Sequence, residues 1–196
     1  MTMTIQHTNR TGDVYYLHER TSKTGKTLYH FSKNPEGILA NAIPEGYEVY
    51  ENPAAQVFLR KIPPKIITDE EVAIVKNGIK EYTKLSYFIV DVKKNSIEVF
   101  LSDQTLDRAN EFCSNLGPLA YGKEDAIKDF LIRHAYYSPM MRFVLINEED
   151  RTFMVERWCF RGRVDDWIDL HAAGDLPSLV RKFCVHLDKE SFYDLM

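Results

Sequence analysis

The chain has 196 residues, which is enough for one large domain or two small ones. Hydrophobic residues make up 44% of it, with 11 Tyr and 11 Phe, so the chain can bury a packed core and does not have the composition of a disordered protein. The formal net charge of -4 argues against a protein that binds nucleic acid through a basic surplus, and leaves only a local basic patch for such a partner.

The three cysteines, Cys113, Cys159 and Cys184, lie far apart, and no pair has the spacing of a zinc or redox motif. Each has apolar neighbours, which predicts buried, reduced thiols. The first residues of the chain have no long apolar core, and no apolar run reaches membrane-spanning length. These features predict a cytoplasmic protein that has no membrane segment and no cofactor.

Residues 1–12 are polar and unpatterned, which predicts a flexible tail. Two β-like runs then flank residues 21–25, a hairpin turn in which Gly25 can take a positive φ. In the register that this turn favours, His18 lies opposite His30. One face of the hairpin is then polar, aromatic and mildly basic, and could bind a partner or remain an exposed sheet face. The candidates on it are Tyr16, His18, Arg20 and His30.

The next stretch is punctuated by proline and glycine. Residues 34–37 and 43–46 both place proline and glycine where a type I turn favours them, and short strands are expected near 47–51 and 56–61. Pro63-Pro64 cannot lie inside a regular element and marks a boundary. We therefore expect an N-terminal β module over residues 13–65. Residues 66–196 are expected to form a larger α+β unit, either separate from the module or continuous with it.

Thr68 and Glu71 form a capping box, which predicts a helix that ends near Lys84. After it, the patterns predict a hairpin, two helices, and an apolar strand that turns into a further strand at 152–160. Two final helices follow, and Asp175 is expected to cap the second of them. Their ranges are 87–92 and 97–101, 105–115 and 124–137, 140–147, then 165–172 and 176–186. Because the strands arrive in hairpins, the fold class is α+β with antiparallel sheets.

Residues 152–160 are the most informative stretch. They are apolar on both alternating faces, which is typical of a strand that is covered on two sides. Glu156 and Arg157 lie in the middle of this strand, where charges are costly to desolvate unless they meet partners or a ligand.

Further arginines and acids surround this strand. Arg142 on the preceding strand falls opposite Glu156 and Arg157, and guanidinium groups that converge here could hold a phosphate or carboxylate. The alternative is an ion-pair network with the nearby acids, and the almost equal numbers of acids and bases favour it. The candidate anion-binding or partner-binding residues are Arg142, Glu156, Arg157, Arg161, Arg163, Asp165 and Asp169.

Asp165, Asp166 and Asp169 could also hold a divalent metal, because the first and last share a face if the segment is helical. Acids in the first turn of a helix complement its dipole without a metal. We favour this second explanation, and predict no metal site.

Asp91-Val92-Lys93 at a strand end resembles half of the acidic-x-Lys signature of restriction-endonuclease-like nucleases. The resemblance implies carboxylates that hold Mg²⁺ and a lysine that stabilises charge on the attacked phosphate. The upstream strand aspartate of that family is missing, and the three residues run into ordinary polar hairpin chemistry, which we favour.

Gly25-Lys26-Thr27 matches the end of a phosphate-binding loop. The full motif needs a glycine five residues before Gly25, where this chain has Arg20, and a helix after it, where a strand is expected. We therefore reject this motif.

No catalytic arrangement is favoured over its structural explanation. The leading hypothesis is a non-catalytic binding or protein-interaction protein, with an unknown protein partner or with self-association. The alternative is an enzyme or binder that acts on a phosphate-bearing substrate, nucleic acid included, through the Arg/carboxylate cluster.

Overall fold

The computed structural model describes residues 4–160 and 165–195. The chain divides into two compact units, Met1–Pro63 and Pro64–Met196, and two prolines, which interrupt regular hydrogen bonding, lie at the division. The sheets are antiparallel, and the described residues contain four α-helices, so the predicted α+β class is confirmed.

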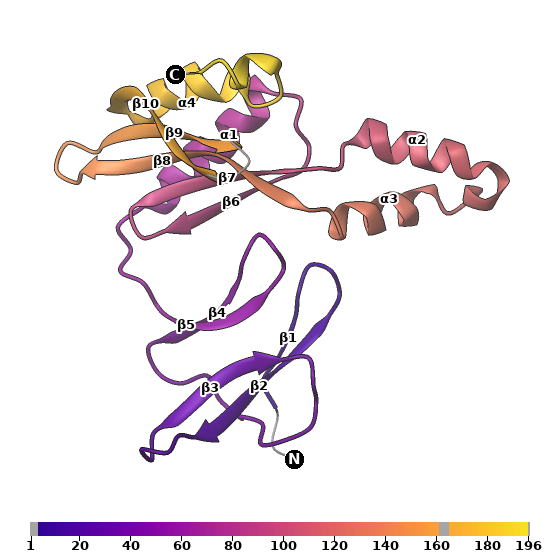
Figure 1. Cartoon of the computed structure of the whole chain (residues 1–196), viewed down its shortest axis with the longest axis vertical. Helices are drawn as coiled ribbons and strands as arrows, with labels where there is room; N and C mark the ends of the chain where they lie inside the picture. The colour runs from indigo at the N-terminus through magenta and orange to yellow at the C-terminus, as the bar shows by residue number, and fades with distance from the viewer. Residues whose placement is uncertain (1–3, 161–164, 196) are drawn as a thin grey trace. The chain divides into compact units, whose positions relative to one another are not determined.

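The first unit has a three-stranded sheet in the order β1-β2-β3 and a separate two-stranded sheet of β4 and β5 (Figure 1). The strands of this unit are β1 (Gln6–Thr8), β2 (Val14–Thr21), β3 (Thr27–Ser32), β4 (Tyr47–Glu51) and β5 (Val57–Lys61). The predicted hairpin register is confirmed, because His18 and His30 are partners across β2 and β3.

Strand β1 lies in the segment that the sequence predicts as a flexible tail. Its three residues pair with β2, and the turn that follows is held by Asn9, whose Nδ2 donates to Ala55 O at 2.7 Å and whose Oδ1 accepts from Asp13 N at 2.8 Å. Backbone hydrogen bonds to β2 and the buried side-chain amide of Asn9 hold this short polar strand in place. Neither interaction produces an apolar pattern in the sequence from which the strand could be predicted.

The second unit is built on a five-stranded antiparallel sheet in the order β10-β9-β8-β7-β6. Helices α1 (Asp69–Tyr82) and α4 (Leu176–Phe183) cover one face of it (Figure 1). The strands are β6 (Phe88–Lys93), β7 (Ser96–Ser102), β8 (Tyr137–Asn147), β9 (Thr152–Phe160) and β10 (Asp165–Asp175). Alternate residues of the central strands fill the core, Phe143, Phe153 and Val155 among them.

The two covering helices begin at the predicted caps. Thr68 Oγ1 accepts from Glu71 N at 3.2 Å, and Glu71 Oε2 accepts from Thr68 N at 2.9 Å, which completes the capping box of α1. The helices approach closely at Gly78, where an added Cβ would lie 2.1 Å from Cγ1 of Val180. Glycine at this position therefore sets the distance between α1 and α4.

The sequence-based prediction of a short helix at 165–172 is wrong, because these residues belong to β10. Ile168 and Leu170 face the core while Trp167 and Asp169 face away from it, and the strand pairs with β9 along its length. The ladder is interrupted by a bulge between Asp169 and Ala173. Alternation broken by a bulge resembles a short amphipathic helix when the partner strand is not known.

Strand β9 also departs from its prediction. Phe153, Val155 and Arg157 are buried beneath the helices, whereas Glu156 and Trp158 on the opposite face are only partly buried. The expected two-sided cover is therefore complete on one face only, because cross-strand neighbours, and no helix, shield the other.

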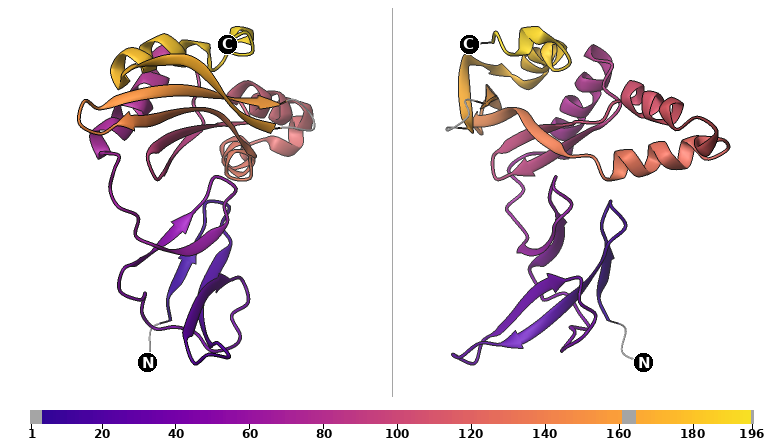
Figure 2. Two further views of the ribbon diagram at one scale, coloured as in Figure 1. Left: turned by 60° about the vertical axis from the view of Figure 1, so that its left-hand side comes forward. Right: turned by 45° about the vertical axis from the view of Figure 1, so that its right-hand side comes forward.

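A helical arm separates β7 from β8. We use the name arm for residues 103–136, which contain α2 (Leu106–Leu116), the short 3-10 helix η1 (Gly117–Ala120) and α3 (Glu124–Arg133). Helices α2 and α3 pack on each other and project beyond one end of the sheet in both figures (Figures 1 and 2). Helix α3 ends earlier than predicted, because Tyr137 already belongs to β8.

After α4 the chain turns through two short 3-10 helices, η2 (Cys184–His186) and η3 (Glu190–Phe192). Phe192 is fully buried against the core, which fixes this last segment to the sheet. The three cysteines are free and buried, and burial raises the pKa of the Cys184 thiol to about 12.

Candidate functional site

Arg142 lies on the sheet face that the helices leave open, and carboxylates surround it. Its Nε donates to Glu156 Oε2, and its Nη1 lies 4.0 Å from Oε1 of Glu98. Lys93, from the nuclease-like tripeptide, donates to the other oxygen of Glu98 at 2.7 Å. The Arg142 guanidinium also stacks 4.5 Å from the centre of the Trp167 ring. Its charge is therefore already balanced within the sheet.

Arg157 points to the opposite, helix-covered face, where it is buried. Its partners are backbone carbonyls: Nε donates to Leu195 O at 2.6 Å, and Nη2 donates to Tyr193 O at 3.3 Å. Arg157 thus joins the last residues of the chain to β9. Arg142 and Arg157 lie on neighbouring strands but do not converge on one ligand.

The aspartates of β10 make local contacts. Asp166 Oδ1 accepts from Trp167 N at 2.7 Å, and Asp169 Oδ1 accepts from His171 N at 2.8 Å. Within the described residues, no group of three His, Cys, Asp or Glu side chains is arranged to hold a metal ion. Arg161 and Arg163 lie outside the described residues.

The hairpin face of the first unit is only partly accessible. His18 is buried, its Nε2 lies 2.8 Å from Asn34 O, and its ring stacks on His30 with 5.2 Å between centroids. Tyr16 is half-buried, so Arg20 and His30 are the exposed members of the four candidates. The loop that follows β3 covers His18, as its bridge to Leu39 shows.

His186 and Ser191 form a histidine–serine pair, with 2.8 Å between Nδ1 and Oγ. Within the described residues no hydrogen bond joins Nε2 of His186 to a carboxylate, so a third group that would orient a catalytic imidazole is missing there. The pair closes the turn between η2 and η3, and we assign it a structural role.

The arm presents the most prominent exposed apolar surface of the second unit. Helix α3 has no buried residue, and among the α2 residues whose burial the structure describes, the buried ones are the small side chains Ala109 and Cys113. The large apolar side chains left exposed on its helices and tip are Phe112 (46%), Leu119 (78%), Tyr121 (86%) and Phe130 (59%), and Tyr136 at its base is also exposed. An exposed apolar group of this kind marks an interaction surface more often than a free surface.

Helical geometry places the two phenylalanines on the same side of the arm. Phe112 follows the buried Ala109 by three residues, and Phe130 follows the half-buried Ile127 by three residues. Ala109 and Ile127 mark the line along which the two antiparallel helices contact each other. A residue three positions later is rotated by the same angle away from this line on either helix, so both phenylalanines point to the same side of the arm. The other side carries polar side chains, among them Asn110 and Asp125.

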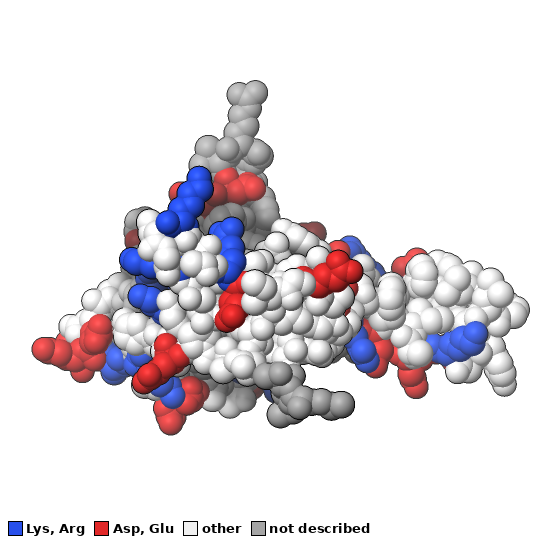
Figure 3. All heavy atoms as spheres, turned by 90° about the horizontal axis from the view of Figure 1, so that it is seen from below, with Lys and Arg blue, Asp and Glu red and all other residues white. Residues whose placement is uncertain are grey.

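Figure 3 views the molecule from below, with the arm at the right. Much of the arm surface on this face is uncharged, and blue and red side chains are scattered between the white areas. Both helices carry acids and bases, as Asp107, Arg108 and Glu111 show in α2. The arm therefore combines apolar contact area with charges of both signs.

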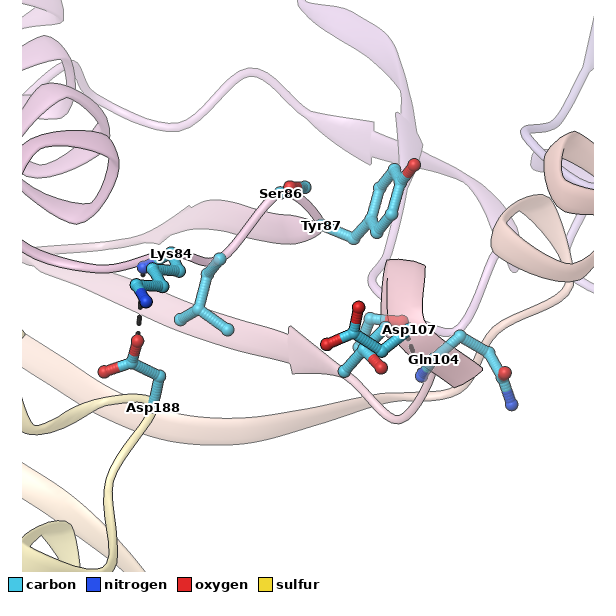
Figure 4. A pocket seen from close by; sticks show the side chains of 9 residues that line it. Lys84, Ser86, Tyr87, Gln104, Asp107 and Asp188 are labelled. Atoms are coloured by element: carbon cyan, nitrogen blue, oxygen red, sulfur yellow. Dashed lines mark hydrogen bonds between the residues drawn. The ribbon is translucent and has the colours of Figure 1, made fainter. Parts of the chain in front are cut away.

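A polar cleft lies where the arm leaves the sheet. It comprises two adjoining hollows of about 370 Å³ and about 490 Å³ that share Ser102, Thr105 and Asp188. Figure 4 shows the first hollow, in which the Lys84 amide donates to Asp188 at 3.1 Å and the Asp107 carboxylate lies opposite Tyr87.

The lining of this cleft is of mixed sign. Lys84 and Arg108 supply cationic groups, and Asp103, Asp107 and Asp188 supply carboxylates. Arg108 is already bound to Asp103 O at 2.6 Å through Nη1. The cleft could receive polar side chains or a small zwitterion. It does not concentrate the positive charge that a phosphate would need.

The sequence predicted both helices of the arm but not its exposed surface. The signal in the sequence was Phe112 and Phe130. Each lies beside, and not on, the line of apolar residues by which its helix contacts the other helix of the arm. The pattern alone cannot tell whether a third element covers such side chains.

No family model, no curated protein and no solved structure matches this chain. None of the helices in the described part of the chain has both the length and the apolar composition that a membrane crossing needs. The functional argument therefore depends on the chain's own geometry.

Proposed function

We propose that this is a non-catalytic protein-interaction protein and that the arm is its partner-binding surface. The observation that carries the proposal is the exposure of Phe112, Leu119, Tyr121 and Phe130 on one projecting hairpin. Aromatic side chains of this kind are the usual anchors of protein interfaces, because each buries a large area at a small cost in conformational entropy.

The alternative, a phosphate-bearing substrate at the Arg/carboxylate cluster, has less support. Arg142 is bound by Glu156 and Glu98, and Arg157 is bound by carbonyl groups, so a phosphate would have to displace an existing partner. The proposed compartment is the cytoplasm, which the free, buried cysteines support.

Photo-crosslinking tests the proposal. A benzophenone amino acid replaces Tyr121 at the tip of the arm, and in a matched control protein it replaces Tyr193, which is 60% exposed outside the arm. In extracts of the producing cells, we expect a discrete crosslinked species from position 121 and none from position 193. Equal labelling from both positions, or none from either, would contradict an arm-mediated interaction.

A further inference from the structure

We infer that the partner of the arm is a second copy of this chain, and that two arms pack face to face as a four-helix bundle. This inference rests on the proposed function and adds the identity of the partner. It begins from the arm itself, which is a single layer of two antiparallel helices. Two such layers packed on each other form a four-helix bundle, whose facing sides enclose a core.

The placement of the aromatic side chains supports this packing. Phe112 on α2 and Phe130 on α3 lie on one side of the layer, so a second layer covers both at once. In a twofold arrangement with antiparallel arms, the tip of one arm, with Leu119 and Tyr121, lies beside the base of the other, where Tyr136 is 64% exposed.

The exposed area is sufficient for a reversible dimer. Since a large apolar side chain can bury about 150–250 Å², the exposed fractions of Phe112, Leu119, Tyr121 and Phe130 present roughly 500 Å² on each arm. A pair of arms would then bury roughly 1,000 Å², which is near the lower limit for a specific interface. An interface of this size is typical of a weak, reversible complex.

The charges on the arm also favour a like partner. Helix α2 carries Asp107, Arg108 and Glu111, and helix α3 carries Glu124, Asp125, Lys128, Asp129 and Arg133. Because each helix carries both signs, a twofold axis does not bring two surfaces of one sign together. The described residues of the arm form no surface of a single charge sign that would attract a strongly acidic or strongly basic partner.

Sedimentation velocity of the whole protein, between about 1 and about 200 µM, tests the inference. We expect a species of twice 22.8 kDa to become populated as the concentration rises. The double variant Phe112→Ser/Phe130→Ser should weaken this association by at least about tenfold. The matched control is Phe58→Ser in β5, because Phe58 is 45% exposed and Phe112 is 46% exposed.

The outcomes separate this inference from the proposed function. A monomer at every concentration overturns self-association, yet the proposed function stands if position 121 still crosslinks to a different protein. A dimer that the double variant does not weaken also overturns the inference, since the copies then meet elsewhere. Circular dichroism verifies that the variants are folded, and Leu119→Ser/Tyr121→Ser at the tip is the second variant if the first does not fold.

Discussion

Arg142 and Arg157 lie on neighbouring strands, β8 and β9, and have different partners on opposite faces of the sheet. Arg142 balances two carboxylates that are largely shielded from water, since Glu98 and Glu156 have side chains that are 6% and 15% exposed. Removing the cation would leave Glu156 without its ion-pair partner and Glu98 with Lys93 as its remaining cation. The residue is therefore best understood as a structural charge.

The variant Arg142→Met tests this role. We expect the free energy of unfolding to fall by about 2 kcal/mol, because two poorly hydrated carboxylates lose a cation. The matched control is Arg133→Met, which breaks an exposed pair with Asp129 and should cost less than about 0.5 kcal/mol. Urea denaturation measures both changes. Similar losses for the two variants would show that Arg142 has no special structural role.

Single residues also show which contacts could be predicted from the sequence and which could not. The neighbourhood of Arg142 and Glu156 could be predicted, because opposite charges on adjacent strands are expected to meet. The partners of Arg157 could not, because they are main-chain carbonyls of residues 193 and 195, and any residue type can supply a carbonyl.

At the level of elements, capping side chains decide where helices begin. Asp175 precedes α4, and one of its carboxylate oxygens accepts from Ser178 N at 3.0 Å. The hydrogen bonds from Ser178 hold the pKa of Asp175 below its usual value of 3.8. Since the folded state favours the ionised carboxylate, the stabilisation is present above the usual pKa and is lost as the pH falls through the lower, folded-state pKa.

The variant Asp175→Ala should therefore lower Tm at neutral pH, and the difference from the parent protein should shrink below about pH 4. Thr105→Ala at the start of α2 is the control, because its hydroxyl accepts from Arg108 N at 3.2 Å and does not titrate. Thermal unfolding at a series of pH values measures both. A constant difference for Asp175→Ala down to about pH 2 would rule out a contribution from its ionised form.

Elements that begin at clear capping residues were predicted correctly. Elements whose conformation depends on pairing with a neighbouring strand were not. Helix α1 has Thr68 and Glu71 at its start, and its prediction is confirmed. Strand β10 has no comparable signal: Asp165 and Asp169 fit the first turn of a helix as well as they fit one face of a strand. Only pairing with β9 decides between the two.

At the level of the whole molecule, the described core residues of the second unit all lie after the Pro63–Pro64 division. Its members run from Ile66 to Leu195 and join the sheet to α1, α4 and the last turns. A core that is complete within one unit can fold without the other. Residues 64–196 should therefore form an independent domain.

Tryptophan fluorescence provides a direct test, because both tryptophans of the chain, Trp158 and Trp167, lie in this unit. We expect the fragment 64–196 to unfold cooperatively, with a midpoint within about 3 °C of the transition that the full chain shows by the same probe. A fragment with exposed tryptophans and no transition would mean that the first unit contributes to this core.

The arm leaves and rejoins the sheet at one point. Ser102 and Tyr137 are partners across β7 and β8, and just beyond them Asp103 N donates to Tyr136 O at 2.9 Å. An insertion that is closed at its root in this way can lengthen, shorten or change its sequence without moving the strands below it. Related chains could therefore evolve different binding preferences on an unchanged scaffold.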